Sequence, residues 1–189
     1  EDMESCAFAK VRDPQISGTT IEFYTGDEIA PGGYLWVFPR GEGYANIGLG
    51  VLGSKSKPGM AKRLLNKWVK ENFPNAETSD IHVGGVPVAH WTNPLVKEGV
   101  VLVGDAAGQV NALNGGGIAY ALFAGQAAGD AIVSAFGGTK TPEYKKLKQY
   151  QKVWNKYCGK NQARSHALKS SLIHRRQEFY NDVAHALKD

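Results

Sequence analysis

Four short segments rich in β-branched and aromatic residues occupy the first 51 residues, and turn signals separate them closely. The signals are Gly-Asp, Pro-Gly-Gly and Gly-Glu-Gly, which are typical of tight turns and hairpins. Strands joined this tightly pair antiparallel, because a parallel crossover needs about a dozen or more connecting residues. The sequence therefore predicts an antiparallel meander with strands near 5–12, 19–25, 33–38 and 43–51.

A covering helix, and then a different architecture, are expected downstream. The segment Ser56-Lys57-Pro58-Gly59 is typical of a helix start, and apolar residues recur at helical spacing from Met60 to Phe73. Short strands are expected near 81–83 and 86–91. The run Val100-Val101-Leu102-Val103 is apolar at every position, which is typical of a strand buried on both faces of a parallel sheet.

The second half of the chain is predicted to be helical. A helix rich in small residues is expected from Gly117 to Phe136, and Gly137-Gly138 would end it. Polar residues and glycines interrupt the nearly uncharged run at 109–129, whereas a membrane span needs about 20 predominantly apolar residues. We therefore expect a buried helix there, followed by two or three amphipathic helices over residues 139–189.

Charge is distributed unevenly along the 189 residues. Residues 139–189 contain 12 Lys and Arg against 4 Asp and Glu, a net charge of +8, while the rest of the chain carries −4. Such a region would attract anionic lipid headgroups, although solvated helix faces are the simpler alternative. No nucleic-acid-binding motif accompanies the charge, and the first residues carry no secretory signal. We expect a cytoplasmic protein, with peripheral contact to the inner face of the cell membrane through this basic tail.

Cysteine and glycine patterns argue against two kinds of site. Cys6 and Cys158 are the only cysteines, and no Cys/His cluster occurs, so neither a metal site nor a disulfide framework is expected. Residues 48–53 match the dinucleotide-binding pattern GxGxxG. In that motif the helix begins within the glycines, whereas residues 54–58 intervene here. Glycines in a strand that another backbone approaches closely are the better interpretation.

A carboxylate and a glycine-opened helix form the first candidate site. Gly104-Asp105-Ala106 ends the predicted buried strand, and Gly115-Gly116-Gly117-Ile118 opens the long helix. A carboxylate at a strand end accepts hydrogen bonds from ribityl or ribose hydroxyls, and free N–H groups at a helix start attract negative charge. The alternative is a strand-turn-helix in which Asp105 merely caps a turn.

Three aromatic residues form the second candidate site. Tyr34, Trp36 and Phe38 alternate with Leu35 and Val37, so their side chains project from one face of a strand. Such a wall suits a long hydrocarbon chain or a flat ring. An ordinary sheet core remains the alternative.

The order of these segments resembles a known family. PxxYxWxFP at 31–39, GDAAG at 104–108 and a GGGI helix start at 115–118 are together similar to the geranylgeranyl reductases, within the p-hydroxybenzoate-hydroxylase-like FAD flavoproteins. Among these, the archaeal digeranylgeranylglycerophospholipid reductases are the most similar. The resemblance covers residues 15–135 and only the C-terminal half of the family pattern, without the strand-GxGxxG-helix unit that begins it.

The resemblance implies an α+β fold and assigns a different role to each part of the chain. Residues 1–98 would form an antiparallel substrate-binding domain with one covering helix, residues 99–138 the returning strand-helix segment of the FAD domain, and residues 139–189 a basic helical region. Tyr34, Trp36 and Phe38 would line the isoprenoid cavity. The cofactor-binding residues would be Gly104, Asp105, Ala106, Gly116, Gly117 and Ile118.

The activity implied is FAD-dependent reduction of isolated double bonds in geranylgeranyl chains of archaeal-type membrane lipids. The missing N-terminal FAD-binding half and the isoprenoid lipid would be the partners. His90 is a weak candidate for the proton donor, since no other residue stands out. Alternatives are another flavoprotein of the superfamily, such as an aromatic hydroxylase or a quinone-linked dehydrogenase, or a noncatalytic lipid-binding module. A fragment, a split subunit and a degenerate paralogue all fit the missing half.

Overall fold

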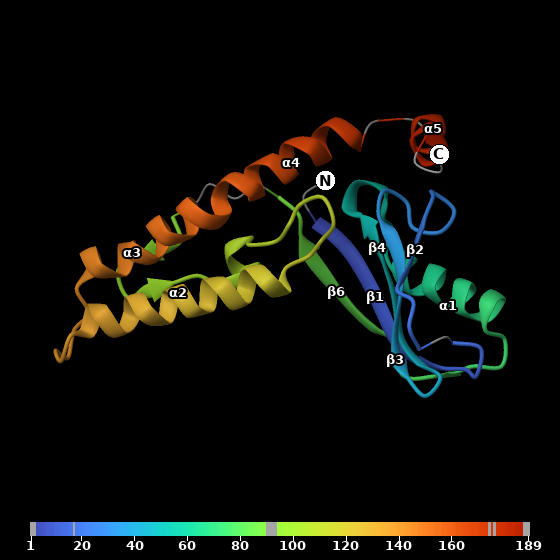
Figure 1. The fold of residues 1–189 in the computed structure, drawn as a ribbon, viewed down its shortest axis with the longest axis horizontal. Helices are drawn as coiled ribbons and strands as arrows, with labels where there is room; N and C mark the ends of the chain where they lie inside the picture. Colours follow the sequence, from blue (N-terminus) through green and yellow to red (C-terminus); the bar gives the residue numbers. More distant parts are fainter. Residues whose placement is uncertain (1–2, 17, 90–93, 174, 176, 187–189) are drawn as a thin grey trace. The chain divides into compact units, whose positions relative to one another are not determined.

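A computed structural model describes residues 3–16, 18–89, 94–173, 175 and 177–186. The chain forms two compact units, and each is described here by itself. The first unit contains the residues up to Val86 together with helix α5 (Gln177–Ala186), and the second runs from Pro87 to Ile173. Figure 1 shows the elements of both.

The first unit is built on an antiparallel sheet. Its strands are β1 (Met3–Arg12), β2 (Glu22–Thr25), β3 (Tyr34–Gly41), β4 (Tyr44–Leu52), β5 (Glu77–Thr78) and β6 (His82–Pro87). The order is β2-β3-β4-β1-β5, and β6 also pairs with β1. The four predicted N-terminal strands are confirmed.

The predicted meander is wrong in one respect, because β1 pairs with β4 and leaves β2 at the sheet edge. Asp13 and Pro14 take the chain out of the sheet after β1. Asp13 is buried, and its Oδ1 accepts a hydrogen bond from the Gln15 N–H at 2.9 Å. The resulting loop is long enough for β2 to form at the far edge, so β4 becomes the neighbour of β1.

Helix α1 (Met60–Asn72) covers one face of this sheet, as its apolar spacing predicts. Leu65, Trp68 and Val69 pack against the strand residues that point toward the helix. Strand residues of alternate positions form most of the rest of this core, namely Ala7, Ala9, Val11, Leu35, Val37, Ala45, Ile47, Leu49 and Val51. The opposite face of the sheet is therefore left to the residues between them.

The second unit is mainly helical. It contains the hairpin β7 (Val96–Lys97) and β8 (Val100–Val101), helix α2 (Ile118–Phe136), helix α3 (Tyr144–Trp154), a π-helical turn (Asn155–Gly159) and helix α4 (Lys160–Leu172). α2 lies alongside α3 (Figure 1). Their shared core is formed by Ala124, Ala128, Ala131 and Ala135 of α2 and by Leu147, Tyr150 and Trp154 of α3.

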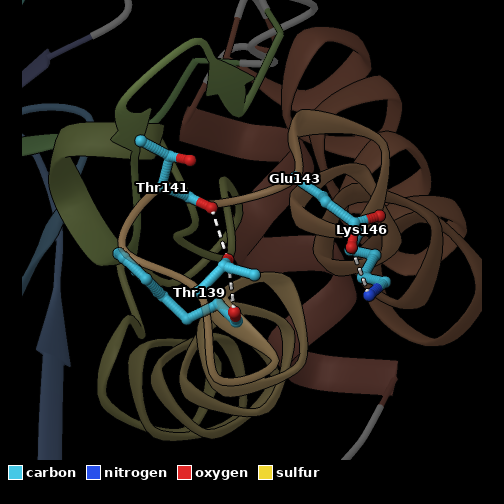
Figure 2. A network of polar contacts seen from close by, with 5 residues as sticks. Thr139, Thr141, Glu143 and Lys146 are labelled. Carbon is cyan, nitrogen blue, oxygen red and sulfur yellow. Dashed lines mark hydrogen bonds and ion pairs between the residues drawn. The ribbon is translucent and has the colours of Figure 1, made fainter.

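The connection between α2 and α3 is closed by polar contacts (Figure 2). The Thr139 hydroxyl lies 2.6 Å from the Phe136 carbonyl and 2.8 Å from the Thr141 carbonyl. Lys146 pairs with Glu143 at 2.6 Å. The Glu143 N–H also donates to the carbonyl of Ala135, which ties the start of α3 to the end of α2.

Burial in this unit differs from the sequence prediction. β8 spans only Val100–Val101 and pairs antiparallel with β7, and Val100, Leu102 and Val103 are exposed. The expected buried parallel strand is thus wrong for this chain by itself, since no parallel neighbour exists among the described residues. The outer face of α2 is likewise exposed at Ile118 and Leu122. By length and composition, α2 is the one helix among the described residues that could cross a membrane, and only 22% of that stretch is buried. The expectation of a buried helix is therefore wrong for this chain by itself.

Two other predictions concern the tail and the domain limits. In the predicted amphipathic tail, Tyr150 and Trp154 are buried, whereas Tyr157, Leu168 and Val183 are exposed. The compact units divide between Val86 and Pro87, whereas the predicted domains divide after residue 98. The predicted limits were defined by the binding roles that the resemblance implies, and they stay a prediction.

Candidate functional site

The turn after strand β8 displays a carboxylate. A 3-10 turn, Gly104–Ala107, begins just after this strand. Gly104 and Gly108 have φ values of 61° and 62°, a left-handed region that residues with a Cβ rarely adopt. The Gly108 N–H donates to the Asp105 carbonyl at 2.9 Å. The two glycines fold the backbone back on itself, and the Asp105 side chain is exposed between them.

Asp105 lies beside the N-terminus of α2. A Cβ added to Gly117, the N-cap residue, would lie 3.2 Å from Asp105 Oδ1 and 3.3 Å from Val110 Cγ2. Gly117 makes no side-chain capping hydrogen bond. The first N–H groups of a helix have no acceptor within the helix. The structure therefore brings the predicted carboxylate and the predicted helix start together, and a side chain at residue 117 would crowd both neighbours.

The loop before α2 fixes this helix start. The Asn111 N–H donates to the Gly116 carbonyl at 3.0 Å, and the Gly115 N–H donates to the Asn111 carbonyl at 2.9 Å. The Asn114 Oδ1 accepts the Gly116 N–H at 2.9 Å. These bonds hold the glycines before α2 in one compact turn.

We call the surface formed by Asp105 and the start of α2 at Gly117 the corner. The other predicted cofactor-binding residues lie around it. Gly104 is buried within the turn, whereas Ala106 and Gly116 are exposed. Ile118 is 81% exposed although it is apolar and begins the helix. The corner thus presents a carboxylate, helix N–H groups that have no acceptor within the helix, and an apolar side chain on one accessible surface.

The three predicted wall residues lie on the sheet face opposite α1. Tyr34, Trp36 and Phe38 are half-buried, and successive ring centroids are 6.0 and 5.9 Å apart. Trp36 and Phe38 are stacked at 28°, and Phe23 of β2 meets Tyr34 and Phe38 edge-on. Phe23 is 60% exposed. The predicted alternation is confirmed, and Phe23 extends the aromatic surface to the edge strand.

Glycines in β4 make room for this wall. Gly48 lies opposite both Trp36 and Phe8, and a Cβ there would be 2.3 Å from Trp36 Cζ2 and 2.7 Å from Phe8 Cβ. Trp36 lies across the glycine and its Nε1 donates to Asn46 Oδ1 at 2.8 Å. The GxGxxG match at 48–53 is therefore a packing feature of a strand, and side chains as well as backbone approach these glycines.

Sequence reasoning missed an ionisable cluster at one end of the wall. Gly50 lies opposite Cys6, and a Cβ at Gly50 would be 2.9 Å from Glu4 Oε2 and 3.4 Å from Cys6 Sγ. Glu4 is only 8% exposed. Burial, and secondarily the charge of Glu4, raises the pKa of Cys6 to about 11. Burial likewise raises the pKa of Tyr34, with smaller contributions from Glu4 and Cys6. Period-two alternation along β1 was the signal available for finding this cluster.

The two predicted sites lie in different compact units. The wall belongs to the first unit, and the corner of Asp105 and Gly117 belongs to the second. His90, the predicted weak candidate for the proton donor, lies outside the described residues.

Comparison with known proteins decides which family carries these features. Residues 2–88 match the geranylgeranyl reductase catalytic domain. A digeranylgeranylglycerophospholipid reductase of Methanothrix thermoacetophila is 40% identical over 99% of this chain and 48% of its own length. The chain belongs to the geranylgeranyl reductase family. The reductase of the same name from Methanosarcina acetivorans is 37% identical over 100% of this chain and 47% of its own length. The chain thus spans about half the length of these relatives, in agreement with the predicted match to the C-terminal half.

Solved structures agree with this family assignment and with the predicted fold. A geranylgeranyl bacteriochlorophyll reductase-like protein from Thermoplasma acidophilum aligns with 94% of this chain and 45% of its own chain, at a TM-score of 0.84 and 27% identity. The myxobacterial chondrochloren halogenase, an FAD-dependent halogenase, shares the fold at a TM-score of 0.58 and 16% identity, over 85% of this chain and 40% of its own. The α+β class, with an antiparallel sheet followed by helices, is confirmed.

Proposed function

We propose that this chain supplies the substrate wall and one side of the flavin site of an FAD-dependent reductase. The reaction is the reduction of isolated double bonds in geranylgeranyl chains of archaeal-type membrane lipids. The names of the relatives support the substrate class, and the FAD-dependent neighbour supports the cofactor. The observation that carries the proposal is the placement of Asp105 against Gly117 at the uncapped start of α2.

The corner of the second unit fits a flavin dinucleotide. The exposed Asp105 carboxylate would accept hydrogen bonds from ribityl hydroxyls. The N–H groups of Gly117 and Ile118, at the positive end of the α2 dipole, would meet the electron-rich edge of the ring system. Glycine at residue 117 lets the Asp105 carboxylate lie this close to the helix start, because a Cβ there would be 3.2 Å from its Oδ1. Bound flavin would supply the hydride that an isolated alkene requires.

The aromatic wall suits the hydrocarbon part of the substrate. Tyr34, Trp36 and Phe38 present a continuous apolar surface on which a prenyl chain would lie, and contact with it would exclude water from the alkene. Orientation of the chain against this rigid sheet would lower the entropic cost of reaching the reactive geometry. The proton donor remains a proposal, with His90 as the weak candidate.

A basic stripe would hold the protein at its lipid substrate. We define the basic stripe as the exposed cations that recur every three or four residues along α3, the π-helical turn and α4, namely Lys145, Lys148, Lys152, Lys156, Lys160 and Arg164. Lys169 is not part of it, because it is buried and donates to the Val88 carbonyl at 3.0 Å. Attraction to anionic headgroups would place the protein on the cytoplasmic face of the membrane.

The missing partner of this chain would be an N-terminal half like that of its relatives, which are about twice as long as the aligned region. The test is a fusion protein that joins this chain to the N-terminal half of the Methanothrix thermoacetophila reductase. The purified fusion should show the visible absorption of bound flavin and, once reduced with dithionite, should add two hydrogens per double bond to a digeranylgeranyl lipid. A fusion that binds neither FAD nor lipid contradicts the proposal, and one that binds lipid without flavin favours a noncatalytic module.

A further inference from the structure

The turn that carries Asp105 is held by two buried side chains that the proposed site does not use. We propose that Gln109 and Tyr150 are positioning residues for the flavin site, and that α3 and α4 therefore belong to the cofactor-binding machinery. This inference rests on the proposed function. It extends the site beyond the motif residues into the helices whose sequence suggested only a basic tail.

A chain of hydrogen bonds links α3 to the turn. The Gly104 N–H donates to Gln109 Oε1 at 2.7 Å, and Gln109 Nε2 donates to the Tyr150 hydroxyl at 2.6 Å. The Tyr150 hydroxyl donates in turn to the Leu102 carbonyl at 2.9 Å. Gln109 and Tyr150 are both 0% exposed. The network therefore connects the residues before and after Asp105 to a fixed point in the α2–α3 core.

Helix α4 holds the other end of the turn. Gln162 is 4% exposed, and its Nε2 donates to the Gly108 carbonyl. The Gln109 N–H donates to the Gly104 carbonyl at 3.0 Å and closes the turn on itself. Both left-handed glycines that flank Asp105 are thus bonded to side chains outside the turn.

The chemistry of these groups indicates orientation in addition to packing. The neighbouring core between α2 and α3 is apolar, for example at Leu147 and Trp154. Apolar side chains could therefore fill the volume that Gln109 and Tyr150 occupy, if packing were their only role. Buried amide and hydroxyl groups act at fixed directions, and a network whose members are all bonded specifies one geometry. Loss of one member leaves a buried donor or acceptor unpaired. The position of Asp105 relative to Gly117 is therefore expected to depend on Tyr150.

The experiment compares Tyr150→Phe with Tyr157→Phe in the fusion protein. Tyr157 is 58% exposed, so its hydroxyl serves as the control. Tyr150→Phe should weaken FAD binding by about tenfold, the effect of losing a buried hydrogen-bond network member. It should also change the circular dichroism of the bound flavin, which a loss of global stability alone would not do. Tyr157→Phe should leave both unchanged.

A second readout is independent of flavin. Amide hydrogen exchange should accelerate at Gly104, Gly108 and Gln109 in Tyr150→Phe, and not at the middle of α1. Unchanged FAD affinity, flavin dichroism and exchange at the turn would overturn the inference. If the unmutated fusion binds no flavin, the proposed function fails, and the cofactor role of Gln109 and Tyr150 fails with it. Faster exchange confined to the turn in Tyr150→Phe would still show that Tyr150 holds the turn in place.

Discussion

Asp105 Oδ1 lies 3.2 Å from the point where a Cβ of residue 117 would stand. The carboxylate comes from the turn after β8, and residue 117 is the N-cap of α2. This short distance means that a hydrogen-bond acceptor lies beside the first N–H groups of α2, which have no acceptor within the helix. Each group alone is common in proteins, and their proximity is what makes the corner a candidate for a flavin.

Removal of the carboxylate is the first prediction. In the fusion protein, Asp105→Ala should weaken FAD retention by roughly 10- to 100-fold, because hydrogen bonds to a charged group contribute about 1.5–3 kcal/mol. Equilibrium dialysis with FAD measures this. Asp130→Ala, an exposed carboxylate further along α2, is the control and should retain FAD. Equal retention by both variants would remove Asp105 from the site.

Addition of a methyl group to Gly117 is the second prediction. Gly117→Ala should weaken FAD binding, because the new Cβ would be 3.2 Å from Asp105 Oδ1 and must displace it. Gly125→Ala on the same helix meets open space, so it should raise the free energy of unfolding by about 0.5–1 kcal/mol and should retain FAD. Titration with FAD and thermal unfolding distinguish the two. Full FAD affinity in Gly117→Ala would show that the methyl group is tolerated.

The third prediction concerns the aromatic wall. Gly48→Ala would place a Cβ 2.3 Å from Trp36 Cζ2, so Trp36 must move and lose its hydrogen bond to Asn46. Overpacking of this kind costs about 1–3 kcal/mol. Urea unfolding of the chain should show this loss, while Gly84→Ala, which meets open space, should cost less. Equal midpoints for the two variants would contradict the packing described for Trp36.

The fourth prediction concerns alkaline pH. The pKa of Cys6 is raised from 9.0 to about 11 by burial and by Glu4, so the folded state keeps the thiol proton longer than the unfolded state does. The stabilising contribution is present below pH 9 and is lost as the pH rises through about 11. Cys6→Ser should therefore reduce the fall in unfolding free energy over this window.

The contribution of Glu4 can be measured separately. In a Cys158→Ser background, alkylation by iodoacetamide reports the Cys6 thiolate alone. Glu4→Gln should shift the pH dependence of alkylation to lower pH, because it removes the negative charge that helps raise the pKa. An unchanged profile would show that Glu4 does not act on Cys6.

The fifth prediction tests the basic stripe. Lys148→Gln, Lys152→Gln and Lys156→Gln combined should weaken binding to anionic vesicles by roughly 100-fold, since each cation near the surface contributes about 1 kcal/mol. The matched control neutralises Lys57, Lys62 and Lys70, which are exposed cations near or on α1. Vesicle flotation with and without anionic lipid measures both. Equal effects of the two triple variants would reject a specific role for the stripe.

Local patterns in the sequence predicted where each strand or helix lies better than they predicted which elements pair or pack together. Alternation placed Tyr34, Trp36 and Phe38 on one face, and helical spacing located α1 and α2. The pairing of β1 with β4 was not predicted, because turn signals report only adjacent segments. The prediction of a buried strand at 100–103 was wrong for a related reason, since burial depends on neighbouring strands that the described residues do not supply.

The candidate site was predictable only in part. The motif residues Asp105 and Gly117 could be paired from the order of strand, turn and helix. Gln109 and Tyr150 could not, because they are 41 residues apart, and because glutamine is mostly exposed in proteins and tyrosine is often only partly buried. Glu4 was missed because a carboxylate in a strand is usually exposed, and its burial becomes apparent only when Gly50 is seen beneath it.

The most direct test of the central claim is a crystal structure of the fusion protein with FAD bound. The account predicts the isoalloxazine edge within hydrogen-bond distance of the Gly117 or Ile118 N–H, with the Asp105 carboxylate bonded to a hydroxyl of the cofactor. A structure in which FAD binds elsewhere, while protein side chains fill the corner at the start of α2, would contradict it.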